Sequence, residues 1–479
     1  MESINRNQLI DLEIQNVAFG GKGIAKVPTA KGDYVLFVPN TIKGQKVRAR
    51  VVKRKSKYGE CKLVEVLEKS PDEVSIPYQA ISGAPYATLP LDIQHENKQS
   101  QVLDIYRKIA RITNVEELFD EYIVSPKNWH YRNKMEYSFS AIGYDVEKQE
   151  EFDGFALGFK KRGTWWIVEN LEKDSGLFDG DFENELKTIR AFCEQSGLPA
   201  WHPPKKEGFF RYLVVRKSFL SDKLLVKLVT SSDGLERFDF NAFVQLLTQL
   251  FPNRLEGILH ITNDDIGDNA QSRLGNETLL YGNPFITEKL LGLTFEISMQ
   301  SFFQTNPLCA ELLYKKATSY AVEGKSDFSN KTIMDLFCGT GTIGQIIAST
   351  TKAKVIGVDI VAEAIENAKE NAAKNKIDNV TFYAADVNKF LMEYPEYSGK
   401  IDTIILDPPR AGIAKKALHR MLDLGANRLV YVSCNPATQA RDILEIKEKG
   451  YELKKFSLVD QFPHTSHVES VCLFEKVSN

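Results

Sequence analysis

From about residue 306 to the C-terminus, short apolar strands alternate regularly with helical segments. The expected strands read TIMDLFC, KVIGVDI, VTFYAADV, IDTIILDPP, RLVYVSC, ELKKFSLVDQF and SVCLFEKV. Helical stretches such as AEAIENAKENAAKN lie between them. Such alternation is typical of a parallel sheet with helices on both faces. The pattern predicts a doubly wound, Rossmann-like α/β domain over residues 301–479, whose ligands bind at the carboxyl ends of the strands.

Two further domains precede this region. Residues 1–67 read as five short strands separated by glycine turns, which predicts a small barrel of the oligonucleotide-binding kind. Residues 78–300 mix strands and helices without regular alternation, so we expect a central α+β domain there. A proline-containing stretch at 70–77 is the expected linker. The chain is therefore predicted to hold three domains.

Charge is unevenly distributed along the chain. The net charge is −3, yet residues 43–62 hold nine Lys or Arg and a single acid. Because Val47, Ala49 and Val51 alternate with the basic residues, a strand here would present one cationic face. Such a face suits a nucleic-acid backbone, although a charge run can also be a solvated strand surface.

The first strand of the alternating region runs into DLFCGTGTIG, residues 335–344. Gly339 and Gly341 allow a tight turn that brings backbone amides to a nucleotide or nucleoside. Asp359 ends the next strand, where a carboxylate can accept hydrogen bonds from ribose hydroxyls. Asp386 ends the third, where it could accept from an adenine amino group. Each acid could instead be a helix cap.

Two more strand ends carry candidate chemical groups. The prolines of LDPPRAG fix Asp407 at the carboxyl edge of the sheet, and VSCNPAT brings Cys434 to the same edge. Together these loops suit S-adenosylmethionine better than a dinucleotide. Cys434 alone would be an inert buried thiol more often than a nucleophile, but its position favours a reactive group. Glu469, just before the last strand, could serve as a base.

At this point the sequence resembles the RNA 5-methyluridine methyltransferases, which act on uracil C5 of tRNA or of 23S ribosomal RNA. The motifs, in their family order, are YRNKMEYSF, SFFQTN, DLFCGTGTIG, LDPPRAG, SCNPAT and FPHTSHVE. The resemblance implies a TRAM domain at the N-terminus, a nucleophile at Cys434 and a proton-abstracting base at Glu469. It also implies four S-adenosylmethionine contacts, at Gln304, Phe337, Asp359 and Asp407. Phe337 stands where the family commonly has tyrosine, and Asp359 where it commonly has glutamate.

The chain departs from many ribosomal RNA members in one respect. These carry four cysteines for an iron–sulfur cluster between barrel and central domain, but residues 77–99 contain no cysteine. We expect no iron–sulfur cluster, no other metal site, and apolar packing of this segment. The six cysteines are scattered and expected to be reduced in the cytoplasm.

The TRAM-like barrel favours 23S ribosomal RNA over tRNA as the substrate. A tRNA uracil-C5 methyltransferase and a non-catalytic RNA-binding protein on the same fold are the alternatives. We also expect a monomer with no membrane segment.

Overall fold

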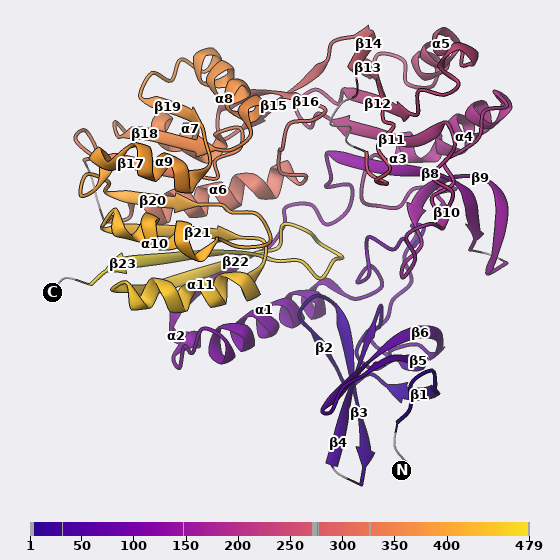
Figure 1. Ribbon diagram of the computed structural model, residues 1–479, viewed down its shortest axis with the longest axis horizontal. Coiled ribbons are helices and arrows are strands. Elements are labelled where there is room, and N and C mark those ends of the chain that lie inside the picture. The colour runs from indigo at the N-terminus through magenta and orange to yellow at the C-terminus, as the bar shows by residue number, and fades with distance from the viewer. Residues whose placement is uncertain are drawn as a thin grey trace.

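The computed structural model of the chain describes residues 4–30, 32–146, 148–270, 275, 277–324 and 327–477. Figure 1 shows three parts: the indigo barrel at the bottom, the magenta central part at the upper right, and the orange-to-yellow sheet and helices at the left. None of the helices within these described ranges is long and apolar enough to cross a bilayer.

The N-terminal part is a six-stranded sheet in the order β1-β5-β6-β4-β3-β2. Its strands are β1 (Leu9–Glu13), β2 (Asn16–Ala18), β3 (Lys22–Thr29), β4 (Gly32–Pro39), β5 (Lys46–Arg54) and β6 (Tyr58–Glu68). The sequence predicts a single strand over the stretch that forms β1 and β2. The structure divides it in two, because β1 pairs with β5 and β2 pairs with β3. Val47, Ala49 and Val51 of β5 point into the barrel core, as their alternation predicted.

Acids partly neutralise the predicted cationic face of the barrel. Lys46 pairs with Glu68, Arg48 with Asp11 and Lys53 with Glu60. By contrast, Arg50 and Lys62 lie directly opposite each other on β5 and β6. Neither of these two cations forms an ion pair with an acid in the described part of the chain.

The central part is built on a seven-stranded sheet in the order β10-β9-β8-β11-β12-β13-β14. Its strands are β8 (Lys134–Asp145), β9 (Glu150–Lys160), β10 (Val168–Asn170), β11 (Phe210–Lys217), β12 (Leu224–Thr230), β13 (Leu255–Thr262) and β14 (Glu277–Gly282). Its helices are α3 (Gly180–Asn184), α4 (Leu186–Gln195) and α5 (Phe240–Leu250). The sequence predicted α3 and α4 as one helix, but the chain breaks at Glu185. The hairpin of β15 (Phe285–Leu290) and β16 (Leu293–Ser298) then leads toward the C-terminal part.

The C-terminal part has the predicted doubly wound sheet. The order is β19-β18-β17-β20-β21-β23-β22-β7. Its strands are β17 (Thr332–Leu336), β18 (Lys354–Asp359), β19 (Val380–Ala384), β20 (Thr403–Leu406), β21 (Arg428–Ser433), β22 (Tyr451–Val459) and β23 (Glu469–Lys476). Helices on its two faces are α6 (Pro307–Val322), α7 (Thr342–Thr350), α8 (Ala362–Lys374), α9 (Val387–Glu393), α10 (Lys415–Asp423) and α11 (Pro436–Glu448). As predicted, Asn306 caps α6 and Pro307 begins it.

The edge of this sheet departs from the expected domain division. Strand β7 (Phe119–Ile123) pairs in parallel with β22, and helix α1 (Leu91–Lys108) packs against α11. Between them lies the short helix α2 (Val115–Leu118). Residues 91–123 therefore belong spatially with the C-terminal sheet, so a division at residue 300 does not describe this packing. The central part is an insertion into the C-terminal fold, entered after β7 and left before α6.

Candidate active site

A tight turn follows β17 and leads into α7. Three of its residues, Phe337, Gly339 and Gly341, have positive φ. A methyl group added at Gly341 would lie 2.4 Å from the Phe382 ring, whereas one at Gly339 would meet only Phe302, at 3.9 Å. Gly341 is therefore required for packing, and Gly339 leaves open space. Phe337 holds a left-handed conformation that is costly for a residue with a side chain, as is common at functional sites.

Asp359 braces the turn from the end of the neighbouring strand. Its Oδ2 accepts a hydrogen bond from Gly339 N at 2.9 Å, and its Oδ1 accepts one from Val361 N at 2.9 Å. The structure thus brings together two predicted residues, Asp359 and Gly339. Each carboxylate oxygen keeps a lone pair for a further donor.

Asp386 acts as a helix cap at the end of β19. Its Oδ1 accepts a hydrogen bond from Lys389 N at 3.0 Å at the start of α9. The sequence left a cap and an adenine contact as alternatives. The cap is present, and the second carboxylate oxygen stays available for the predicted adenine contact.

Gln304 is buried where three separate motifs meet. Asn133 Nδ2 donates to Gln304 O at 3.2 Å, and Gln461 Nε2 donates to Gln304 Oε1 at 3.4 Å. These residues belong to YRNK, SFFQTN and DQFPH in the sequence. The contacts fix the predicted residue between the central part and the catalytic sheet.

Cys434 and Glu469 lie at adjoining ends of neighbouring strands. The pairing of β21 with β23 ends at Ser433 and Ser470; Cys434 is the first residue after β21, and Glu469 is the first residue of β23. The charge of Glu469 acts on the Cys434 thiol, so the two side chains lie near each other. Cys434 is half-buried, and Glu469 is 3% exposed. The sequence predicted this meeting at the sheet edge.

Burial dominates the electrostatics of this edge. It raises the pKa of Glu469 to about 8, and the nearby Asp407 adds to that rise while Arg410 opposes it. Burial also raises the pKa of Asp407 to about 7. Burial and Glu469 raise the pKa of the Cys434 thiol to about 11, and Arg410 limits the rise. Burial thus favours the protonated forms of Glu469, Asp407 and Cys434, and among the residues that the structure describes the one cation that acts on this group is Arg410.

The segment that carries Glu469 is held by residues that sequence reasoning missed. Gln94 at the start of α1 accepts a hydrogen bond from His464 N at 2.8 Å and contacts His464 Nδ1 at 3.1 Å. Trp129 stacks on the His464 ring at 3.6 Å between centroids. Residues 77–99 do bury Tyr86 and Leu89, but Gln94 adds a polar contact that we did not predict. No run of sequence links residues 94 and 464, so no local pattern could have revealed it.

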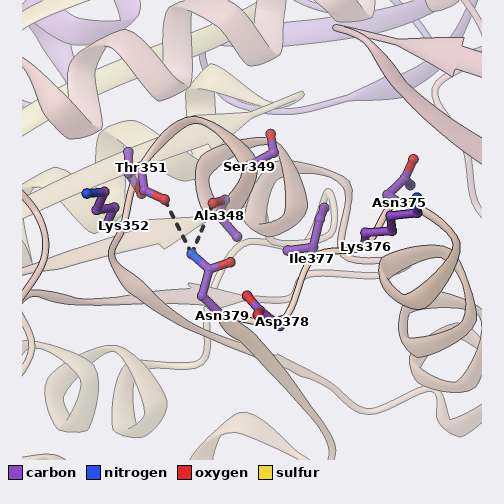
Figure 2. A pocket seen from close by; sticks show the side chains of 9 residues that line it. All are labelled: Ala348, Ser349, Thr351, Lys352, Asn375, Lys376, Ile377, Asp378 and Asn379. Atoms are coloured by element: carbon purple, nitrogen blue, oxygen red, sulfur yellow. Dashed lines mark hydrogen bonds between the residues drawn. The ribbon is translucent and has the colours of Figure 1, made fainter.

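A separate pocket of about 460 Å³ lies away from this site (Figure 2). It lies where α7 and α8 end and β18 and β19 begin. This is the side formed by the amino ends of the strands, opposite the carboxyl ends that carry the candidate site. Asn379 Nδ2 donates to the carbonyl oxygens of Ala348 and Thr351 there, at 3.0 and 3.3 Å (Figure 2). These bonds tie the end of α7 to the segment before β19, and none of the predicted site residues lines this pocket. Among the described residues, no cluster of three His, Cys, Asp or Glu side chains could hold a metal ion.

Comparison with known proteins agrees with this arrangement. Residues 5–64 match the family model of the TRAM domain, and residues 327–472 match that of a methyltransferase domain. The chain is similar to an uncharacterized RNA methyltransferase of Caldanaerobacter subterraneus subsp. tengcongensis, with 38% identity over 98% of this chain and 99% of that protein. An uncharacterized RNA methyltransferase of Bacteroides thetaiotaomicron is 34% identical over 96% of this chain and 100% of its own length.

A solved structure resembles the whole chain. It is the tRNA (uracil-54, C5)-methyltransferase of Pyrococcus abyssi in complex with S-adenosyl-L-homocysteine. The TM-score is 0.70 at 26% identity, over 97% of this chain and 100% of that one. With relatives matched over their full length, this chain belongs to the RNA methyltransferase family, with a TRAM domain ahead of its methyltransferase domain.

Proposed function

We propose that this methyltransferase modifies C5 of uracil in RNA through a covalent adduct between Cys434 and uracil C6. The observation that carries the proposal is the placement of a thiol and a buried carboxyl on adjoining strand ends, Cys434 and Glu469. Methylation of a base nitrogen or of a protein amine would need no nucleophilic thiol. The similarity to an enzyme named for uracil C5 supports the same reaction.

The residues at the sheet edge fit S-adenosylmethionine, the methyl donor of such enzymes. The open space at Gly339 and the free lone pairs of Asp359 suit a ribose, and Asp386 has an oxygen to spare for an adenine amino group. Gln304, Phe337 and Asp407 would complete the site. When bound, the donor supplies a methyl group on a positively charged sulfur.

The chain's own groups account for the other steps. C5 of uracil is a weak nucleophile, so the Cys434 thiolate first adds to C6. The electron pair of the C5–C6 double bond then shifts to C5 and its conjugated carbonyl, which activates C5. After C5 is methylated, Glu469 removes the C5 proton, the double bond re-forms, and the C6–sulfur bond breaks to return the thiolate.

This chemistry requires a uridine that has left its stack. Both C5 and C6 must be approached from the face of the ring, so the base has to be turned out into the site. The substrate is therefore an RNA loop or an opened helix.

We place the protein in the cytoplasm, acting as a monomer.

We favour 23S ribosomal RNA as the substrate because of the TRAM barrel. The similar enzyme of P. abyssi acts on tRNA by its name, which favours tRNA as a second candidate. Mass spectrometry of both RNAs from a deletion strain distinguishes the two, because 5-methyluridine disappears from one of them. Retention of every such site in both RNAs would contradict the substrate assignment.

The covalent step has its own test. Glu469→Gln keeps the shape of the side chain but cannot accept the C5 proton, so enzyme and RNA should accumulate as a linked species on a denaturing gel. Adding Cys434→Ala should abolish that species. A linked species that survives without Cys434 would assign the nucleophile elsewhere, and a non-catalytic RNA-binding protein would form none.

A further inference from the structure

An exposed tryptophan stands on the turn between β9 and β10. The turn reads KKRGTWW, residues 160–166, and Trp165 is 53% exposed. Trp201, by comparison, is 5% exposed, and Trp129 stacks on His464. Tryptophan is enriched at binding interfaces, because its ring offers a large apolar face together with a polar N–H.

The turn holds Trp165 in a fixed place. Lys161 N donates to Ile167 O at 2.8 Å, and Thr164 Oγ1 donates to Lys161 O at 3.0 Å. Trp166 meets the Trp165 ring edge to face, at 5.5 Å between centroids, and Trp166 O accepts from Ser140 Oγ at 3.1 Å. The ring is thus presented by a hydrogen-bonded turn.

The turn carries two cations of its own, and a third, from the barrel, lies beside it. Lys161 lies over the ring of Tyr144, and Arg162 is the next residue. The turn also touches the barrel, because a methyl group added at Gly163 would lie 3.9 Å from Lys62 Cε. In the described part of the chain, none of these three cations forms an ion pair within 4.0 Å.

The surrounding charge remains positive. Lys62 faces Arg50 across two strands, an arrangement of like charges that is unfavourable unless an anion accompanies it. Glu169 lies near Lys161 and Arg162; burial raises the pKa of its carboxyl, and the charges of the two cations oppose that rise. Aromatic rings beside such cations suit single-stranded nucleic acid, since the cations follow the phosphates and the ring stacks on a base.

The surface patch formed by Trp165 and the cations Lys62, Lys161 and Arg162 adjoins the segment that carries Glu469. Tyr86 N donates to His464 O at 2.9 Å, and the charge of Arg162 acts on the Tyr86 hydroxyl. The barrel turn is close as well, since a methyl group added at Gly21 would lie 3.2 Å from Ser466 Cβ. These contacts connect the barrel and the Trp165 turn to the segment that carries Glu469.

We propose that Trp165 stacks on an unpaired base of the RNA substrate outside the active site, while Lys62, Lys161 and Arg162 contact the phosphates on either side. The proposal rests on the proposed function only in taking RNA as the substrate. It extends the RNA-binding surface from the barrel across to the central part.

A fluorescence titration of the full-length chain tests this stacking. The probe is a short, labelled, single-stranded oligoribonucleotide of mixed sequence, without methyl donor so that no turnover occurs. Loss of one stacked base weakens binding about 5-fold to 150-fold, so Trp165→Ala should do the same, and Trp165→Phe should restore most of the affinity. A duplex of the same sequence should bind wild type and Trp165→Ala alike.

Tyr281 gives a matched control on the same sheet. It is an exposed aromatic residue on β14, the strand at the opposite edge from β10, so Tyr281→Ala should leave RNA affinity unchanged. Lys62→Gln should reduce the slope of log affinity against log salt by about 0.7, the value for one phosphate contact on a single strand.

Two results would overturn the proposal. One is that Trp165→Ala binds the single-stranded oligoribonucleotide as tightly as the wild type does. The patch would then be assigned to an acidic protein partner instead of RNA. The other is a loss in Trp165→Phe as large as in Trp165→Ala, which would rule out stacking. Methyl transfer to RNA is measured separately, so its absence in the wild type would remove the proposed chemistry and leave the binding result intact.

Discussion

Lys98 Nζ lies 2.5 Å from Asp460 Oδ1, in an ion pair that is closed to water on both sides. Lys98 also donates to Phe462 O at 3.0 Å, and His95 lies 2.9 Å from Asp460 Oδ2. Burial by itself would raise the pKa of Asp460, but the His95 and Lys98 contacts outweigh it and leave that pKa below its ordinary value. The pair joins α1 to the segment that leads from β22 to Glu469.

Removing one partner of this pair should destabilise the protein strongly. Lys98→Met leaves a buried carboxylate without its counter-charge, which costs about 3–5 kcal/mol of unfolding free energy. Denaturant titration of the full chain measures the change. The double variant Lys98→Met/Asp460→Asn should recover most of the loss. Equal instability in single and double variants would mean that packing of the lysine stem matters more than the charge.

The rate of methyl transfer should rise with pH through about 8 and continue to rise above it, because the reaction also needs the Cys434 thiolate and burial raises the pKa of that thiol to about 11. Glu469 must be ionised to accept the C5 proton, and its raised pKa of about 8 keeps it protonated at lower pH. Single-turnover rates at saturating RNA and donor, measured across this range, give the midpoint. A rate that falls over the same range would exclude Glu469 as the base.

Arg410 should set the position of that midpoint. Its charge lowers the pKa of Glu469 and of Cys434, so Arg410→Gln should move the midpoint of the profile to higher pH. Arg410→Lys retains the charge and should move it less. A reduced rate with an unmoved midpoint would instead indicate that Arg410 only contacts RNA.

Asp359→Ala should weaken binding of S-adenosylmethionine by about tenfold or more. The variant removes the acceptor of two backbone hydrogen bonds, one of which holds Gly339 in place, and hydrogen bonds to a charged acceptor contribute about 1.5–3 kcal/mol each. Calorimetric titration with the donor measures the loss. Asp359→Asn keeps one acceptor oxygen and should fall in between. Unchanged affinity in both variants would place the ribose elsewhere.

Asp386 can be tested for its two roles separately. Serine is also a good cap, so Asp386→Ser should keep the stability of α9 but lose the carboxylate, whereas Asp386→Ala should lose about 1 kcal/mol of stability as well. If the carboxylate contacts adenine, both variants should bind the donor more weakly to the same extent. Donor affinity equal to wild type in Asp386→Ser would leave Asp386 as a cap alone.

The candidate site was predictable where each residue follows from strand period and turn chemistry. Gly339, Asp359, Asp407 and Cys434 each stand where an apolar run stops, and parallel strands bring such ends to one edge. The contacts that hold this edge were not predictable in the same way. Gln94 and Lys98 lie in an ordinary amphipathic helix, and their partners come more than 360 residues later.

The edge strand β7 was missed for a related reason. The stretch FDEYI is too short and too polar to be predicted as a strand of a buried sheet. Its partner strand, β22, lies more than 300 residues later in the sequence. Its pairing depends on tertiary contacts such as the hydrogen bond from Ser457 Oγ to Asp120 Oδ2, at 3.4 Å. Strand preference of this kind is set by the surroundings more than by the residues themselves.

The position of β7 also dictates an order of assembly. Ser457 and Asp120 are 337 residues apart, so a ribosome releases the edge strand long before the strand it pairs with. Closing so long a loop is slow, and until it closes the backbone groups of β22 are exposed to pairing with other chains. The barrel and central sheet can fold during synthesis, whereas the catalytic sheet is completed only after β23 has emerged.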